Sequence, residues 1–214
     1  MSFLQQFDTV WGPKLALRRR TFRKIFEYLL TRRPSGHLIV ETGCARNAEN
    51  WSGDGQSTFL FDRFVTEFDG HVNSVDISAA ACNFARSIVG PRTEIRTEDS
   101  VLFLSRLARE LTTSRREIDL LYLDSFDWAP DNPVPSAVHH LKELCAIAPA
   151  LTPGTLVVVD DSFRLLMGVP NDDQRMVFND LGLDGKAKFV AQYFQQTGAQ
   201  MIFEGYQCGW LIPG

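Results

Sequence analysis

Short apolar runs alternate with amphipathic stretches along most of the chain, and this alternation most constrains the fold. Runs such as IDLLYLD (118–124) and TLVVVDD (155–161) have the length and composition of buried strands. Between them, SAVHHLKELCAIAPAL (136–151) repeats apolar residues at helical spacing. The expected strands are residues 37–41, 71–76, 93–97, 118–124 and 155–161, and the expected helices are 15–31, 58–68, 79–89, 101–111, 136–151 and 187–198.

Five strand–helix units in succession predict an α/β protein with a doubly wound, Rossmann-like parallel sheet and right-handed crossovers. Two further strand patterns within residues 199–212 follow one another closely, so they must pair antiparallel. Residues 162–185, which contain Gly168-Val169-Pro170-Asn171, are expected to be loop-rich. A chain of 214 residues predicts a single domain overall, with residues 1–36 as an N-terminal helical segment and residues 37–214 as the α/β part.

Composition narrows the class of protein further. The net charge is −4, so a nucleic-acid partner has no global electrostatic support. No apolar run approaches the roughly 20 residues that span a bilayer, and the N-terminus lacks the pattern of a signal peptide. Cys44, Cys82, Cys145 and Cys208 are scattered without CxxC spacing and are interpreted as reduced thiols. We therefore expect a cytoplasmic protein without a membrane span.

Polar residues gather at the carboxyl ends of the expected strands, where ligands bind in doubly wound sheets. The carboxylates at these positions are Glu41, Asp76, Asp124, Asp160 and Asp161. Gly43 follows the first strand and would let a ligand approach the backbone. Ser57 or Thr58 would cap the next helix, whose N–H groups could face an anionic group.

An adenosine ligand fits the order of these residues best. Asp76 ends the second strand, where a carboxylate can accept both hydroxyls of a ribose. Asp99 and Ser100 follow the third strand, where a side chain could accept a hydrogen bond from an adenine amino group. Gly53-x-Gly55-x-x-Thr58 is a weak match to the dinucleotide fingerprint because it comes about ten residues late and lacks the third glycine. No phosphate-binding P-loop motif is present.

These motifs resemble those of class I S-adenosylmethionine-dependent methyltransferases over roughly residues 37–214. The likeness rests on ETG (41–43), GQST (55–58), SVDIS (74–78), EDS (98–100), LYLDS (121–125) and LTPGTLVVVDDS (151–162). It implies a seven-stranded sheet of order 3-2-1-4-5-7-6 that ends in an antiparallel hairpin. It also implies S-adenosyl-L-methionine as cofactor, bound by Glu41, Gly43, Gly55, Ser57, Thr58, Asp76, Asp99, Ser100 and Asp124. The first loop is stretched here by CARNAENWSGD, and we expect it to cover substrate as well.

Asp124, Asp160 and Asp161 end neighbouring strands, so three carboxylates should converge. Uncompensated, they would repel one another, and a divalent cation such as Mg²⁺ would resolve this. The arrangement resembles that of metal-dependent O-methyltransferases acting on small molecules and sugars, which implies methylation of a hydroxyl on a sugar, glycan or other polyhydroxy acceptor. The alternative is that the second aspartate of the pair only caps a loop and that no metal binds.

The proton acceptor is expected to be Asp127, with His139 and His140 as alternatives. Two rival functions stay open: a metal-dependent enzyme of another class on a related sheet, such as a hydroxylase, a hydrolase or a nucleotide-sugar enzyme, and a methyltransferase-like binding module without catalysis. The arginines of residues 18–33 form either a solvated helix face or a platform for an acidic group. A homo-oligomer is compatible with the sequence, which does not identify the acceptor.

Overall fold

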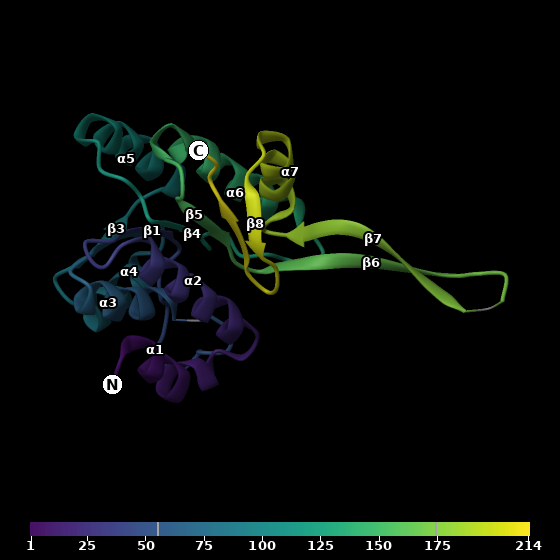
Figure 1. Cartoon of the computed structure of the whole chain (residues 1–214), viewed down its shortest axis with the longest axis horizontal. Coiled ribbons are helices and arrows are strands. Elements are labelled where there is room, and N and C mark those ends of the chain that lie inside the picture. Colours follow the sequence, from purple (N-terminus) through teal and green to yellow (C-terminus); the bar gives the residue numbers. More distant parts are fainter. Residues whose placement is uncertain (55, 174) are drawn as a thin grey trace.

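A computed structural model describes residues 1–54, 56–173 and 175–214. Its centre is a seven-stranded sheet of order β3-β2-β1-β4-β5-β9-β8 (Figure 1). The strands β1 to β5 run parallel, and β9 is antiparallel to both of its neighbours. The strands of this sheet are β1 (Leu38–Thr42), β2 (His71–Asp76), β3 (Thr93–Thr97), β4 (Leu120–Leu123), β5 (Leu156–Val159), β8 (Gln200–Phe203) and β9 (Cys208–Leu211). The predicted fold class and strand order are confirmed.

Helices cover both faces of the sheet, as the alternating pattern predicted. The helices that connect or follow the strands are α3 (Ser57–Glu67), α4 (Ala79–Ile88), α5 (Ser100–Ser114), α6 (Val134–Ile147) and α7 (Lys188–Thr197). The chain starts with α1 (Phe3–Gln6), and α2 (Arg19–Arg32) leads into β1. No helix of the described residues is long and apolar enough to cross a membrane.

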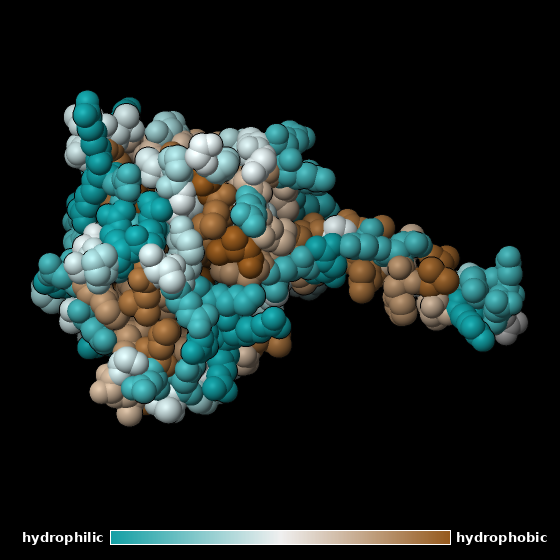
Figure 2. Space-filling model, in the orientation of Figure 1, coloured by the Kyte–Doolittle hydropathy of each residue, from teal (hydrophilic) through white to brown (hydrophobic). Residues whose placement is uncertain are grey.

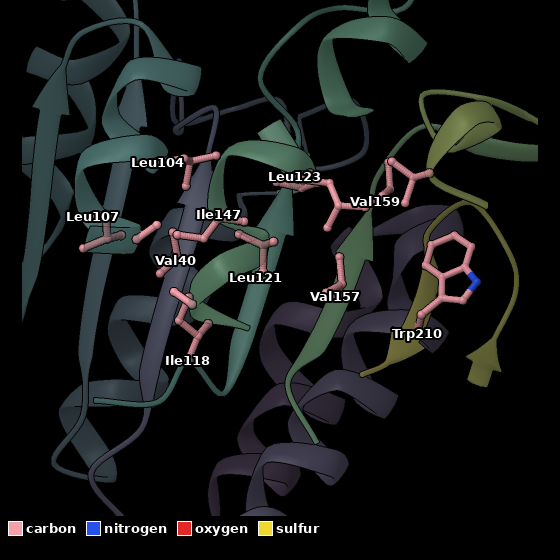
Figure 3. Packing of buried hydrophobic residues seen from close by; sticks show 14 of the residues in the cluster. Val40, Leu104, Leu107, Ile118, Leu121, Leu123, Ile147, Val157, Val159 and Trp210 are labelled. Atoms are coloured by element: carbon pink, nitrogen blue, oxygen red, sulfur yellow. The ribbon is translucent and has the colours of Figure 1, made fainter. Parts of the chain in front are cut away.

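Successive residues of the central strands point to opposite faces, so each face receives its own core. On one face, Val40, Leu121 and Val157 pack with Leu104 and Ile147 of α5 and α6 (Figure 3). On the other face, strand residues pack against α3 and the N-terminal helices, and aromatic rings dominate that cluster. Its aromatic members include Phe3, Phe7, Phe22, Phe26, Phe61, Phe64 and Tyr122. The N-terminal helices therefore share one core with the sheet.

The prediction for residues 162–185 is wrong. They form a long two-stranded antiparallel hairpin, β6 (Ser162–Pro170) and β7 (Met176–Gly185), that projects away from the body of the molecule (Figure 1). We call this hairpin the arm. Its backbone groups pair with each other along the ribbon, while the residues at 164–173 and 175–181 are exposed. The pattern of a strand buried on one side is therefore missing from its sequence.

Candidate functional site

A cleft lies at the carboxyl ends of β1 and β2, beside the point where the strand order reverses between β1 and β4. It consists of two hollows of about 290 and 310 Å³ that share Asp76, Ile77 and Ser125 in their walls. The first hollow is also lined by Gly43, Cys44, Arg46, Asp54, Ser57, Ser78, Asp124 and Asp127. The second is also lined by Asp99, Ser100, Phe126 and His139. Most of the predicted site residues are thus brought to one cleft.

Gly43 forms the floor of the first hollow. Its φ is +79°, a conformation that side chains disfavour, and its N–H donates to the carbonyl of Val75. A Cβ at this position would lie 2.4 Å from the backbone oxygen of Asp124. Only glycine fits where the backbone leaves β1 and passes β4.

Asp76 stands between the two hollows at the end of β2. Its Oδ1 accepts from the backbone N–H of Ser78 at 2.7 Å, and its Oδ2 accepts from that of Cys44 at 3.2 Å. These bonds fix the carboxylate while its lone pairs toward the cleft stay accessible, because each oxygen can accept more than one bond. The geometry is suited to binding a diol.

Asp99 and Ser100 begin α5 at the far end of the second hollow. Asp99 is the N-cap, and its Oδ1 accepts from the N–H of Leu102 at 2.9 Å. The Oγ of Ser100 lies 3.0 Å from Nε2 of His139, which in turn lies 3.3 Å from a carboxylate oxygen of Glu143. The hydrogen bond to Glu143 raises the pKa of His139. His139 therefore belongs to the wall of this hollow, away from Gly43.

Glu41, an expected cofactor residue, lines neither hollow. It is fully buried and accepts hydrogen bonds from Ser57, Thr58 and Ser74 at 2.5 to 2.8 Å. Burial raises its pKa to about 7. Glu41 positions the start of α3 and thereby the loop over the cleft.

The expected cap of this helix by Ser57 or Thr58 is wrong, because Gln56 occupies the N-cap of α3 and no side chain caps it. Ser57 and Thr58 are the first helical residues. Their hydroxyls turn inward to Glu41, and Thr58 also accepts from the N–H of Ala45 at 2.9 Å. Gly55, another predicted cofactor residue, lies outside the described residues.

Asp124, Asp160 and Asp161 do converge, as predicted, but two buried cations compensate them. Arg18 Nε lies 2.7 Å from Asp160 Oδ2, and Arg18 Nη2 lies 3.0 Å from Asp161 Oδ1. Lys186 Nζ lies 2.5 Å from Asp124 Oδ1 and 2.9 Å from Asp161 Oδ2. Burial lowers the pKa of Lys186, but the surrounding carboxylates outweigh this and raise it above its usual value. Lys186 thus joins Asp124 and Asp161 through two salt bridges, and we call it the clamp.

This arrangement does not fit the predicted metal. Asp160 already accepts from Arg18, from the hydroxyl of Tyr122 at 2.7 Å and from the N–H of Asp161 at 2.8 Å. In the described part of the chain, no group of three or more His, Cys, Asp or Glu residues is placed to hold a metal ion. The metal was predicted because the three carboxylates were expected to lack counter-charges. The salt bridges of Arg18 and Lys186 remove that reason.

The three candidate proton acceptors lie in different surroundings. Asp127 lines the first hollow and is paired with Arg46, whose Nη1 lies 2.9 Å from Oδ2. His140 is fully buried in α6, with Nδ1 2.7 Å from the carbonyl of Ser136, and burial lowers its pKa to about 4. Because His140 lines neither hollow, it cannot take a proton from a ligand there. Among the three, only Asp127 lies near Gly43.

Arg18 and Lys186 were missed by the sequence analysis. Arg18 is the first arginine of the basic cluster and directly precedes α2. It is buried, while its neighbours Arg19 and Arg20 are exposed. The guanidinium of Arg18 also stacks on Tyr206, at 4.4 Å from the ring centroid. The prediction of three converging carboxylates was itself a signal, because such a cluster requires cations from somewhere in the chain.

Comparisons with known proteins give distant likenesses only. No protein-family model and no curated protein sequence matches the chain. Among solved structures, the DhpI–SAH complex has 13% identity over 99% of this chain and 97% of that one, with a TM-score of 0.42. A short-chain dehydrogenase/reductase from Saccharomyces cerevisiae has 18% identity over 54% and 49%, with a TM-score of 0.40. NSun6 from Pyrococcus horikoshii, solved with SFG, has 11% identity over 77% and 51%, with a TM-score of 0.41. The chain thus spans about half the length of the last two, and likenesses this distant do not assign a function.

Proposed function

We propose that the chain is an S-adenosylmethionine-dependent methyltransferase that acts on a hydroxyl of a sugar, glycan or other polyhydroxy small molecule. The observation that carries the proposal is the position of Asp76 between two hollows at the strand-order reversal. A ligand with a central diol and two unlike ends fits this cleft. An adenosyl group joined to an amino acid has this form.

The cleft's two ends differ in chemistry as the two ends of such a ligand do. The second hollow combines the apolar surfaces of Ile77 and Phe126 with the polar atoms of Asp99 and Ser100. An adenine ring needs flat apolar contact and an acceptor for its amino group. The first hollow exposes backbone at Gly43 and carboxylates at Asp124 and Asp127, which suit a charged amino-acid end and an acceptor beside it.

S-adenosylmethionine, which Gly43, Asp76, Asp99 and Ser100 would hold, would supply an electrophilic methyl group on its sulfonium for transfer to the acceptor oxygen. The chain's own residues then have two tasks. One is to align donor and acceptor, which the rigid contacts of Asp76 and Gly43 provide. The other is to accept the hydroxyl proton, and we assign this to Asp127, which Arg46 holds at the rim of the first hollow.

The proposed mechanism uses no divalent metal. Asp124 and Asp161 are held by Lys186, and Asp160 by Arg18, so their role is to fix the floor of the acceptor site. Burial raises the pKa of Asp124 well above its usual value, although the charge of Lys186 opposes this.

A binding module without catalysis is the second candidate. It is favoured by one observation: each predicted base within the described residues is either ion-paired, hydrogen-bonded to a carboxylate or fully buried. Such a protein would bind the adenosyl ligand and transfer nothing. Turnover distinguishes the two functions.

The test is a transfer assay with methyl-labelled S-adenosylmethionine and a panel of sugars, glycosides and polyphenols. Wild-type protein should label at least one hydroxylated acceptor, and Asp127→Asn should lower the rate about 100-fold or more while S-adenosylhomocysteine still binds. Asp131→Asn, on the same loop but outside both hollows, is the matched control and should keep full activity. Cofactor binding without labelling of any acceptor would favour the binding module.

A further inference from the structure

The arm exposes a series of large apolar side chains that nothing in the described chain covers. Their exposed fractions lie between 39% and 65%. They come from both strands and continue toward the tip (Figure 2). The residues are Leu165, Leu166, Met167, Val169, Met176, Val177, Phe178 and Leu181.

Both faces of the arm are apolar. Directly opposed residues of an antiparallel pair share a face. Phe178 opposite Gly168, and Met176 opposite Pro170, therefore lie on one face, while Val177 opposite Val169 lies on the other. A two-stranded ribbon alone is marginally stable in water, and contiguous exposed apolar surface marks an interaction site. The arm therefore requires a partner.

We call the end of the arm at Ser162 and Gly185 its root, and the turn between β6 and β7 its tip. A surface beside the root complements the tip. A hollow of about 520 Å³ beside the root is lined by Leu17, Arg20, Phe163 and Tyr206, among others. Leu17 is 71% exposed there. At the opposite end of the arm, Asp172 and Asp173 follow β6, and together with Arg175 they give the described tip residues an excess of one negative charge. The charged residues of this mostly apolar hollow are Arg20, Arg164 and Glu204, so it carries one positive charge in excess. It can therefore receive an apolar segment with an excess of negative charge at its end.

The tip cannot reach the hollow of its own chain. Nine residues of strand span about 30 Å, and the arm leads away from the body along this length (Figure 1). Two arms packed side by side in opposite directions about a two-fold axis, however, bring each tip to the other's root. One self-complementary contact then covers one apolar face of each arm, the face that carries Phe178 and Met176, and brings Asp172 and Asp173 to Arg20.

We infer that the arm is a dimerisation element. It packs antiparallel on the arm of a second copy of this chain and places its acidic tip against Leu17 and Arg20 of that copy. This inference does not depend on the proposed methyl transfer, since its observations lie outside the cleft.

The first test is the molar mass in solution, measured by size-exclusion chromatography with light scattering. Wild-type protein should have twice the 24.2 kDa of one chain. Phe178→Glu should return it to one chain. Leu102→Glu is the matched control, because Leu102 is 68% exposed on α5 against 65% for Phe178, and it should remain a dimer. The mass of one chain for wild-type protein up to about 100 μM, or a dimer that survives Phe178→Glu, would overturn the inference.

A charge-reversal experiment tests the antiparallel arrangement itself. Asp172→Lys with Asp173→Lys should weaken the dimer about tenfold or more, and Arg20→Glu should do the same, because each places like charges together. All three changes in one chain should restore much of the affinity, since the charges are then opposite again. A triple variant no tighter than either parent would show that tip and root do not meet.

Discussion

Lys186 Nζ lies 2.9 Å from Asp161 Oδ2, and these two residues flank the arm where its two strands join the body of the molecule. Asp161 immediately precedes β6, and Lys186 immediately follows β7. Their ion pair closes the hairpin and also holds Asp161 in the cluster below the cleft. The arm and the candidate site are therefore built on the same salt bridge.

Removing the clamp should cost much of the stability of the fold. Lys186→Met leaves Asp124 without its cation and Asp161 with Arg18 alone, so the free energy of unfolding should fall by about 3–5 kcal/mol. Urea unfolding measures this change. Lys188→Met is the control, because Lys188 makes a more exposed contact with Asp184 and should cost less than about 1 kcal/mol. Adding Asp124→Asn to Lys186→Met should recover part of the loss, because Asp124 then no longer needs a cation. Equal losses for Lys186→Met and Lys188→Met would contradict this role of Lys186.

Glu41 should make stability depend on pH near neutrality. Its pKa is raised in the folded state to about 7, so the native protein holds the proton more tightly than the unfolded chain does. Its contribution is fully present below the unfolded value of 4.5 and is lost as pH rises through 7, a change of about 3 kcal/mol. Glu41→Gln cannot titrate. As pH rises from 4.5 to 8, the unfolding free energy of the wild type should therefore fall relative to that of Glu41→Gln. A difference between the two proteins that stays constant over this range would refute the assigned titration.

Gly43→Ala should destabilise the protein and narrow the first hollow. Positive φ alone costs a residue with a Cβ roughly 1–2 kcal/mol. At Gly43 the added Cβ would also lie 2.4 Å from the carbonyl oxygen of Asp124, and this clash should increase the loss of stability. Gly198→Ala separates the two effects, because Gly198 has a φ of +77° and a Cβ added there would meet nothing within 4 Å. Thermal and urea unfolding should show a clearly larger loss for Gly43. Similar losses at both positions would mean that the close approach to β4 is unimportant.

Asp76→Asn should weaken binding of S-adenosylhomocysteine by about 10- to 100-fold, since charged hydrogen bonds to both ribose hydroxyls would be lost or reduced. Isothermal calorimetry gives the affinity, and urea unfolding of the same sample shows whether the loop around Cys44 has kept its stability. Asp131→Asn removes an equal charge from an exposed loop position and should bind like wild type. Unchanged affinity in Asp76→Asn would remove this residue from the site.

The sheet could be predicted because its signals are local. Buried parallel strands appear as apolar runs, and the residues just after them, such as Asp76 and Gly43, must lie at one edge of the sheet. The position of Ser100 at the start of α5 followed from the same reasoning. Each of these predictions needed only the order of elements along the chain.

The charge compensation could not be predicted in the same way. Arg18 and Asp160 are 142 residues apart, and no periodic pattern connects them. Arg18 also looks like its neighbours Arg19 and Arg20 in sequence, although only Arg18 is buried. The arm was missed for a related reason: Gly168 and Pro170 are typical of turns, and strands exposed on both faces lack the alternation that half-burial creates.

Calorimetric titration of wild-type protein with S-adenosylhomocysteine decides whether the cleft binds an adenosyl cofactor. We predict one site per chain with micromolar affinity, and the same affinity in the presence of a chelator, because the proposed mechanism uses no metal. Absence of binding to folded protein at about 1 mM ligand would contradict the assignment of the cleft to an adenosyl cofactor.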